Sequence, residues 1–227
     1  MQLFAIIADV DELNNKSRIV VEHFLKQRLA LDQVEIYLGH YDKYLETHHK
    51  VSTKKEGKRK KTSLNSVKVL KICTQINGEL EQRQKIFVLL RLVEYINTDK
   101  TLTDQELEFV DTVSDVFNIP GEELEDIKKF VICSETSAED SEKLLIINSK
   151  EALSARKKNK HIKHDTLSGS LLILSVESVS MYALKFFGDD ELLLNGQIID
   201  PERVYILTQG SSIRSSKVSP IYYSDII

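Results

Sequence analysis

Apolar residues recur at helical spacing from Met1 to about Ser134 and in strand-like runs from about Leu144 onward. An amphipathic helix repeats its apolar face every three to four residues, whereas strands show alternating or short continuous apolar runs. The change predicts an α+β protein in two parts, with an all-α helical bundle over 1–133 followed by a small all-β domain over 144–227. The residues between them, 134–143, are small and acidic, which is typical of a linker.

A helix–loop–helix pattern occurs twice in the helical part. In each copy an apolar helix closes at an aspartate, Asp11 or Asp99, and a short polar loop leads into a second helix. Two copies of one supersecondary unit predict a pseudo-symmetric helical bundle whose halves pack face to face. They also place carboxylates at equivalent positions.

Capping signals predict where the helices begin. A polar residue followed three residues later by glutamate opens helices at Asp32 and Thr103, and Pro120 followed by acids opens another, as the helix dipole favours. The expected helices cover 32–47, 63–77 or 66–77, 79–97, 103–117 and 120–132, in addition to the two helices of the first repeat.

Short apolar runs bounded by turn residues predict strands in the C-terminal part. Asn195-Gly196 stands between apolar residues and is a hairpin signal, because both residue types tolerate positive φ. The chain given ends on an apolar run, 221–227, which we interpret as a buried edge strand or, by preference, as the cut point of a longer protein. The other expected strands are 144–147, 170–176, 181–187, 191–199 and 204–208.

The composition is that of an ordinary globular protein, with 41% hydrophobic and 29% charged residues among 227. The two cysteines, Cys73 and Cys133, lack metal-ligand spacing and predict buried thiols in a reducing compartment. We find no signal peptide and no apolar run long enough to span a bilayer. We therefore expect a cytoplasmic protein.

Charge is segregated along the chain, although the net charge is only −4. Seven basic residues stand against one acid in 50–61, and we expect a solvated loop over 48–62. Such a run can instead bind phosphates of an anionic membrane surface or contact the acidic helices of the same chain. It has no interleaved aromatic residues, so sequence-specific nucleic-acid binding is not expected. The candidate phosphate or membrane contacts are Lys54, Lys55, Lys58, Arg59, Lys60 and Lys61.

The acidic loop of the second repeat is the strongest candidate for chemistry. Asp99 and Glu106 flank one tight loop, and carboxylate oxygens suit hard cations such as Ca²⁺ or Mg²⁺. Asp11 offers an equivalent carboxylate in the first repeat. A structural alternative is open for the same residues, because Thr103 and Glu106 form a capping box and Asp99 can cap a helix end.

No sequence feature favours catalysis. The six histidines form no motif, and no serine or cysteine lies in a recognisable nucleophile motif. Gly57-Lys58 lacks the partner glycine five residues upstream that a phosphate-binding loop requires. We therefore expect a non-enzymatic chain with no certain cofactor, a divalent cation being the one candidate.

The repeat and its loop resemble the TerB-like family of tellurite-resistance proteins. Asp99 and Glu106 match the family's aspartate and its glutamate seven residues later, and Asp11 matches the aspartate in the first copy. The resemblance covers about 1–132. It implies a compact helical bundle whose acidic residues, here Asp99, Glu106 and Asp11, take part in metal binding.

A second resemblance concerns 63–77 and the ending at 221–226. Both look similar to the N-terminal region of a group of bacterial ABC-transporter ATPases, which carry a TerB-like domain before the nucleotide-binding cassette and a membrane part. The resemblance implies a chain without Walker motifs that senses, docks or regulates at the inner face of the cytoplasmic membrane. Its partners would be other transporter domains or another protein.

Three hypotheses follow from the sequence. The first is a non-catalytic cytoplasmic regulatory or interaction module of an ABC-transporter ATPase. The second is a divalent-metal-binding stress-resistance protein that uses Asp99 and Glu106, with Asp11 contributing. The third is a binder of anionic membrane or phosphate surfaces through the basic residues between Lys54 and Lys61.

Overall fold

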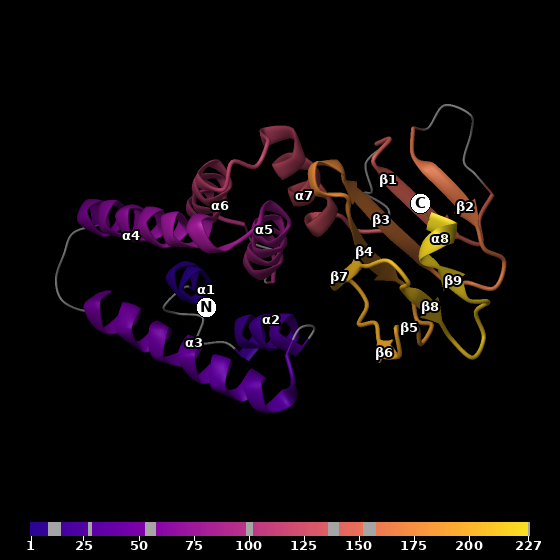
Figure 1. Ribbon diagram of the computed structural model, residues 1–227, viewed down its shortest axis with the longest axis horizontal. Helices are drawn as coiled ribbons and strands as arrows, with labels where there is room; N and C mark the ends of the chain where they lie inside the picture. Colours follow the sequence, from indigo (N-terminus) through magenta and orange to yellow (C-terminus); the bar gives the residue numbers. More distant parts are fainter. Residues whose placement is uncertain are drawn as a thin grey trace. The chain divides into compact units, whose positions relative to one another are not determined.

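The computed structural model describes residues 1–8, 15–26, 29–52, 58–98, 102–135, 141–151 and 158–226. It divides into two compact units, Met1–Lys128 and Lys129–Ile227. Helices build the first unit, and two β-sheets build most of the second (Figure 1). The α+β class expected from the sequence is therefore confirmed.

The helical unit is organised around a buried central helix, α5. All residues of α5 from Leu89 to Ile96 are buried, which is the behaviour expected of a helix that is apolar on nearly every side. Seven helices occupy the described residues up to Ile132: α1 (Gln2–Ile7), α2 (Asn15–Lys26), α3 (Leu31–Ser52), α4 (Lys58–Glu79), α5 (Gln82–Ile96), α6 (Asp104–Val116) and α7 (Gly121–Ile132).

Helix α1 packs against α3, α4 and α5, and it lies between α3 and α4 in Figure 1. Helix α2 packs against α3 and α5, and α6 packs against α4 and α5. Helices α3 and α4 therefore pack mainly on α1, α2 and α6 rather than on the central helix α5. Each of them buries only a narrow stripe of side chains. The stripe on α3 includes Val34, Leu38 and Tyr41, and that on α4 includes Val69 and Cys73.

Aromatic side chains join four of these helices in the core. The ring centroids of Phe4 and Phe24 are 5.8 Å apart, those of Phe24 and Phe87 are 5.6 Å apart, and those of Phe4 and Tyr95 are 5.4 Å apart. The hydroxyls of Tyr41 and Tyr95 share a buried hydrogen bond of 2.8 Å. Each aromatic pair adds about 0.5–1.5 kcal/mol beyond the burial of its area, so this cluster links α1, α2, α3 and α5 energetically.

The two helices of each predicted copy are present, as α1 and α2 in the first copy and as α5 and α6 in the second. The first helix of each pair ends earlier than expected, at Ile7 rather than at Asp11 and at Ile96 rather than at Asp99. In the first copy the chain already becomes extended at Ala8, and in the second the helix is followed by a turn at Asn97 and Thr98. Asp11 and Asp99 themselves lie outside the described residues.

Several of the other helix boundaries differ from the prediction; α4 ends at Glu79 rather than at Asn77, and α5 begins at Gln82 rather than at Glu79. Helix α3 begins at Leu31, which places Asp32 inside the first turn, and it continues to Ser52. Helix α4 begins at Lys58 rather than at Ser63 or Ser66, so the expected loop over 48–62 is wrong at both of its ends. Lysine and arginine are good helix formers, so a charge run is compatible with a helix that is solvated on several sides. The end of α7 at Ile132 is confirmed.

The β unit contains two sheets that enclose one core. Strand order is β2-β1-β3-β4-β7 in the five-stranded sheet and β6-β5-β8-β9 in the four-stranded sheet. Among the strand pairs of the described residues, β1–β2 alone is parallel. The strands are β1 (Leu144–Asn148), β2 (Lys160–Lys163), β3 (Ser170–Val176), β4 (Met181–Phe187), β5 (Leu193–Leu194), β6 (Gln197–Ile198), β7 (Val204–Leu207), β8 (Ser212–Arg214) and β9 (Ile221–Tyr222).

The central strands of the larger sheet are buried on both faces. Leu171 and Ile173 of β3 join the core between the sheets, and Leu172 and Leu174, which point the other way, are also buried. A strand that is covered on both faces reads as a continuous apolar run rather than as an alternation. This explains why 170–176 and 181–187 were predicted with their observed bounds.

The hairpin expected at Asn195-Gly196 is confirmed. Both residues have positive φ, 53° and 87°, and they connect β5 to β6. The predicted strand over 191–199 is therefore two short strands. The end of the chain differs in part, because β9 covers only Ile221–Tyr222 and a short helix, α8 (Tyr223–Ile226), follows.

Two strands had no counterpart in the sequence prediction. They are β2 and β8. Both are short, with four and three residues, so local pattern carries little information about them. Within the described residues, no helix has the length and apolar character needed to cross a membrane.

Candidate functional site

Glu106, the one predicted metal ligand within the described residues, caps its own helix. The Thr103 backbone N–H and the Thr103 hydroxyl both donate to Glu106 Oε2, each at 2.8 Å. The Glu106 backbone N–H donates to Thr103 Oγ1 at 3.3 Å. The capping box predicted at this position is therefore confirmed, and one carboxylate oxygen of Glu106 is already engaged by it.

Replacing Thr103 by Ala should lower the free energy of unfolding by about 1 kcal/mol, because the first turn of α6 loses the side chain that caps it. Thermal unfolding followed by circular dichroism measures the change. Asp104→Ala is the matched control, since Asp104 is exposed and is not part of the capping box. Equal losses in the two variants would contradict the structural role of Thr103.

The metal hypothesis stays a prediction, because Asp99 and Asp11 lie outside the described residues. Among the residues that are described, no group of three or more His, Cys, Asp or Glu side chains is arranged to hold an ion. If a cation binds with a dissociation constant of about 10 μM, 1 mM Ca²⁺ or Mg²⁺ should stabilise the fold by about 2.7 kcal/mol. An unchanged melting temperature rejects the hypothesis, and Glu106→Gln should abolish any rise.

The predicted basic contacts lie partly on a helix. Lys54 and Lys55 are outside the described residues, whereas Lys58, Arg59, Lys60 and Lys61 form the first turn of α4. The side chains of these four residues are not among those described. Their placement on α4 means that the cationic segment continues directly into the part of α4 that packs on the core.

Helix α5 contains a buried ion pair that was not predicted from the sequence. Arg91 Nη1 donates to Glu94 Oε2 at 2.6 Å, and the two side chains are 0% and 7% exposed. The guanidinium carbon of Arg91 lies 5.0 Å from the centre of the Phe87 ring. The sequence did contain a sign of this ion pair. Two opposite charges stand three residues apart in an otherwise apolar helix, and residues at this spacing are neighbours on one helix face.

A buried lysine on β4 also has a defined structural role. Lys185 is 3% exposed, and its ammonium donates to the carbonyl oxygens of Val131 and Cys133 at 2.8 and 3.0 Å. The ammonium also lies 5.0 Å from the centre of the Phe187 ring. A cation that binds carbonyls at the end of α7 interacts favourably with the helix dipole. In the sequence, this buried lysine could have been recognised as the single charged residue within the apolar run 181–187.

A chain of polar side chains ties together the ends of β1, β2 and β3. Ser170 Oγ donates to Glu135 Oε1 at 2.9 Å, and the Asn148 side-chain amide donates to Ser170 Oγ at 3.2 Å. Asn148 Oδ1 accepts from the Lys150 backbone N–H at 3.0 Å and lies 2.9 Å from His161 Nε2. The Ser170 hydroxyl thus faces a carboxylate and an amide rather than a histidine base. We assign these residues a structural role.

The two thiols differ in exposure. Cys73 is buried, and burial raises the pKa of its thiol to about 11. Cys133 is only half-buried, which corrects the expectation that both are buried, and burial raises its pKa although Lys185 opposes the shift. The thiolate is the reactive form, so neither cysteine is activated as a nucleophile.

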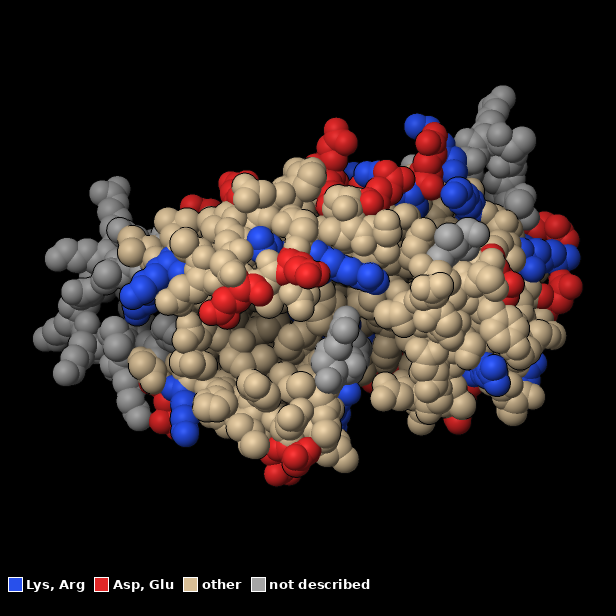
Figure 2. All heavy atoms as spheres, viewed as in Figure 1, with Lys and Arg blue, Asp and Glu red and all other residues tan. Residues whose placement is uncertain are grey.

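Exposed large apolar side chains concentrate on α3 and α4. Of nine such residues in the described part of the chain, five lie on these two helices. We name the side of α3 that carries Ile36, which is 60% exposed, the α3 face; Leu31 and Tyr37, 72% and 44% exposed, lie on other sides of this helix. Val67 and Leu70 form the α4 face and are 62% and 44% exposed. Figure 2 shows that the helical unit is hollowed above α3 and that the atoms visible there are mostly uncharged.

No family model matches the chain, and neither a curated protein nor a solved structure shows significant similarity to it. The resemblances to the TerB-like family and to the transporter ATPases therefore stay predictions. Within the described residues, the exposed apolar side chains of α3 and α4 are a surface feature that the packing of the helical unit does not use.

Proposed function

We propose that this chain is a non-catalytic regulatory and interaction module, acting as the N-terminal region of an ABC-transporter ATPase. The observation that carries the proposal is that five of the nine exposed large apolar side chains in the described part of the chain lie on α3 and α4. Apolar side chains that gather on one part of a surface mark binding sites, whereas isolated ones are ordinary. The partners are other domains of the transporter or a protein that associates with them.

The packing of the helical unit supports this proposal. Ile36 and Val67 lie away from the stripes that α3 and α4 bury, so neither residue is needed to close the core. Tyr37 is an amphipathic aromatic residue of the kind enriched where binding energy concentrates at interfaces. The module would bind its partner through α3 and α4, and the β unit would take no part in this binding.

The coding sequence past Ile227 tests the transporter part of the proposal. A downstream strand–loop–helix with the pattern Gly-x-x-x-x-Gly-Lys-Ser/Thr is expected, because that loop binds the phosphates of ATP. A stop codon directly after Ile227 would refute this part. The test needs no expressed protein and is independent of any partner.

A second candidate is binding to an anionic membrane surface. It is favoured by the finding that Lys58, Arg59, Lys60 and Lys61 begin the same helix that carries the α4 face. Each lysine or arginine near such a surface contributes about 1 kcal/mol, so alanine at all four positions should abolish binding to phosphatidylserine vesicles in a sedimentation assay. Binding that persists in the variant, or that the parent lacks, rejects this candidate.

A further inference from the structure

The four-stranded sheet of the β unit has an outer face that takes no part in the core. Leu194 of β5, Ile213 of β8 and Ile221 of β9 belong to the core between the two sheets. Because successive residues of a strand point to opposite faces, one neighbour of each of these residues in its strand lies on the outer face. These outer residues are Leu193, Arg214 and Tyr222.

One residue from each of the four strands forms a row across this outer face. Leu193 pairs directly with Ile198 of β6 on one side and with Arg214 on the other, and the Cβ atoms of such pairs are about 4.5–5.5 Å apart. The guanidinium carbon of Arg214 lies 5.8 Å from the centre of the Tyr222 ring. The outer row, Ile198, Leu193, Arg214 and Tyr222, thus follows the strand order β6-β5-β8-β9 (Figure 1).

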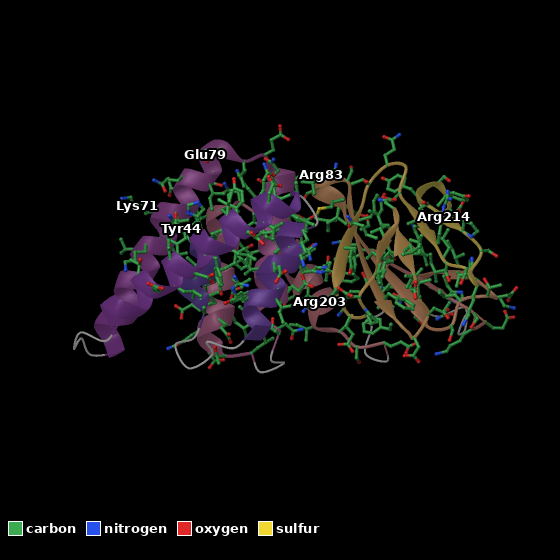
Figure 3. The ribbon with its side chains drawn as sticks, turned by 90° about the horizontal axis from the view of Figure 1, so that it is seen from below. Tyr44, Lys71, Glu79, Arg83, Arg203 and Arg214 are labelled. Carbon is green, nitrogen blue, oxygen red and sulfur yellow. The ribbon has the colours of Figure 1, made fainter. Side chains whose placement is uncertain are left out.

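The outer row is accessible and carries one charge. Ile198 and Tyr222 are 61% and 44% exposed, Arg214 is exposed and Leu193 is half-buried. Among the described residues, no carboxylate pairs with Arg214, which is labelled in Figure 3. Tyrosine and arginine are residue types in which the binding energy of interfaces concentrates. The row therefore suits a protein surface that offers apolar side chains and a carboxylate.

The small size of the outer row favours a partner that is tethered to it. Stable interfaces between separate proteins involve about 20–30 residues on each side, far more than one row provides. A tether raises the effective concentration of a partner to about the millimolar range, where a small contact is sufficient. Tyr222 precedes Ile227 by five residues, which reach at most about 17 Å. A domain that follows Ile227 would therefore be held close to the row.

We propose that the outer row docks on the domain that follows Ile227 and that Arg214 pairs there with a carboxylate of that domain. Ile198 and Leu193 supply the apolar contact, and stacking on Tyr222 holds the guanidinium in place. This inference rests on the proposed function, which places a nucleotide-binding cassette after Ile227. It concerns a contact separate from the one made through α3 and α4.

Thiol labelling of the purified full-length gene product tests the docking. Ile198→Cys places a thiol in the outer row, and Lys160→Cys places one at an exposed position of the other sheet. A contact with a dissociation constant of about 0.1 mM, at an effective concentration of about 1 mM, is open for about one tenth of the time. A bulky maleimide should therefore label Ile198→Cys about tenfold more slowly than Lys160→Cys. Peptide mass spectrometry reads each position separately.

Charge reversal in the Ile198→Cys protein tests the role of Arg214. Arg214→Glu places like charges against each other in the docked contact, so labelling of the thiol should rise about tenfold, to the rate of Lys160→Cys. Lys217→Glu is the matched control, because it reverses an exposed charge in the loop after β8 and leaves the row intact. In this control the labelling should stay slow.

Equal labelling rates for Ile198→Cys and Lys160→Cys would overturn the docking, and so would slow labelling that Arg214→Glu leaves unchanged. A tethered contact does not depend on protein concentration, so slow labelling that becomes fast on dilution would overturn it in favour of a second copy of the chain. In a protein that carries the cassette, each of these results leaves the proposed function standing. A stop codon directly after Ile227 instead refutes the transporter part of the proposed function, and the docking with it.

Discussion

Replacing Arg91 by Met is expected to lower the free energy of unfolding by about 3–5 kcal/mol, because it breaks a buried ion pair by removing one side of it. Arg91 is fully buried and Glu94 is 7% exposed, so water cannot replace the lost guanidinium. The loss would be a large fraction of the total stability of an ordinary domain, which is about 5–15 kcal/mol. Chemical denaturation followed by far-ultraviolet circular dichroism measures it.

The double variant Arg91→Met/Glu94→Met separates the broken pair from lost packing. Buried ion pairs replaced on both sides by apolar residues are often close to neutral, so the double variant should regain much of the stability that the single one loses. A double variant at least as unstable as Arg91→Met would contradict this account. It would show that Arg91 contributes mainly through its contact with Phe87 and the surrounding core.

Replacing Lys185 by Met should have the second largest effect, a loss of about 2–4 kcal/mol. The ammonium satisfies the carbonyl oxygens of Val131 and Cys133, and a buried polar group left without its partner costs about 1–3 kcal/mol. Methionine retains the length of the side chain, so the variant tests the hydrogen bonds more than the packing. Thermal and denaturant unfolding should agree on the loss.

Lys217→Met is the control for Lys185, since it removes the same charge from an exposed position of the β unit. Exposed substitutions of this kind usually change stability by less than about 0.5 kcal/mol. If the two variants lost the same stability, the effect would come from net charge, and the bonds to the end of α7 would have no measurable role.

The periodicity of the sequence was enough to predict the two-part architecture and several elements. The capping box at Thr103, the end of α7 at Ile132 and the hairpin at Asn195-Gly196 were all predicted correctly. In each case the information is local, because a cap or a tight turn is specified by residues within one or two turns of chain. Local signals of this kind do not depend on what packs against them.

Predictions that depend on distant contacts were less successful. Strand β2 is held by parallel pairing with β1, a partner that no local pattern could identify. The basic residues from Lys58 to Lys61 continue α4, because a helix can extend beyond the part that its core contacts require. The buried roles of Arg91 and Lys185 depend on which groups surround them, and sequence spacing alone does not supply those partners.

The candidate site suggested by the structure differs from the one predicted from the sequence, again because the sequence does not show which groups surround a residue. The sequence pointed to carboxylates because acids at a helix–loop–helix turn resemble ligands, and the structure shows Glu106 engaged in a cap. The α3 and α4 faces were not singled out, because an apolar residue in a helix is normally assigned to the core. Only the fold shows that Ile36 and Val67 are more than half exposed.

Steady-state ATP hydrolysis by the full-length gene product tests the central claim most directly, namely that the α3 and α4 faces regulate an ATPase. Val67→Ser/Leu70→Ser removes the α4 face, and Gln75→Ser is the matched control at another exposed position on the same helix. The account predicts that the double variant changes the rate at least about fivefold, the size of a typical coupling between sites, while the control matches the parent. Equal rates in all three proteins would contradict it.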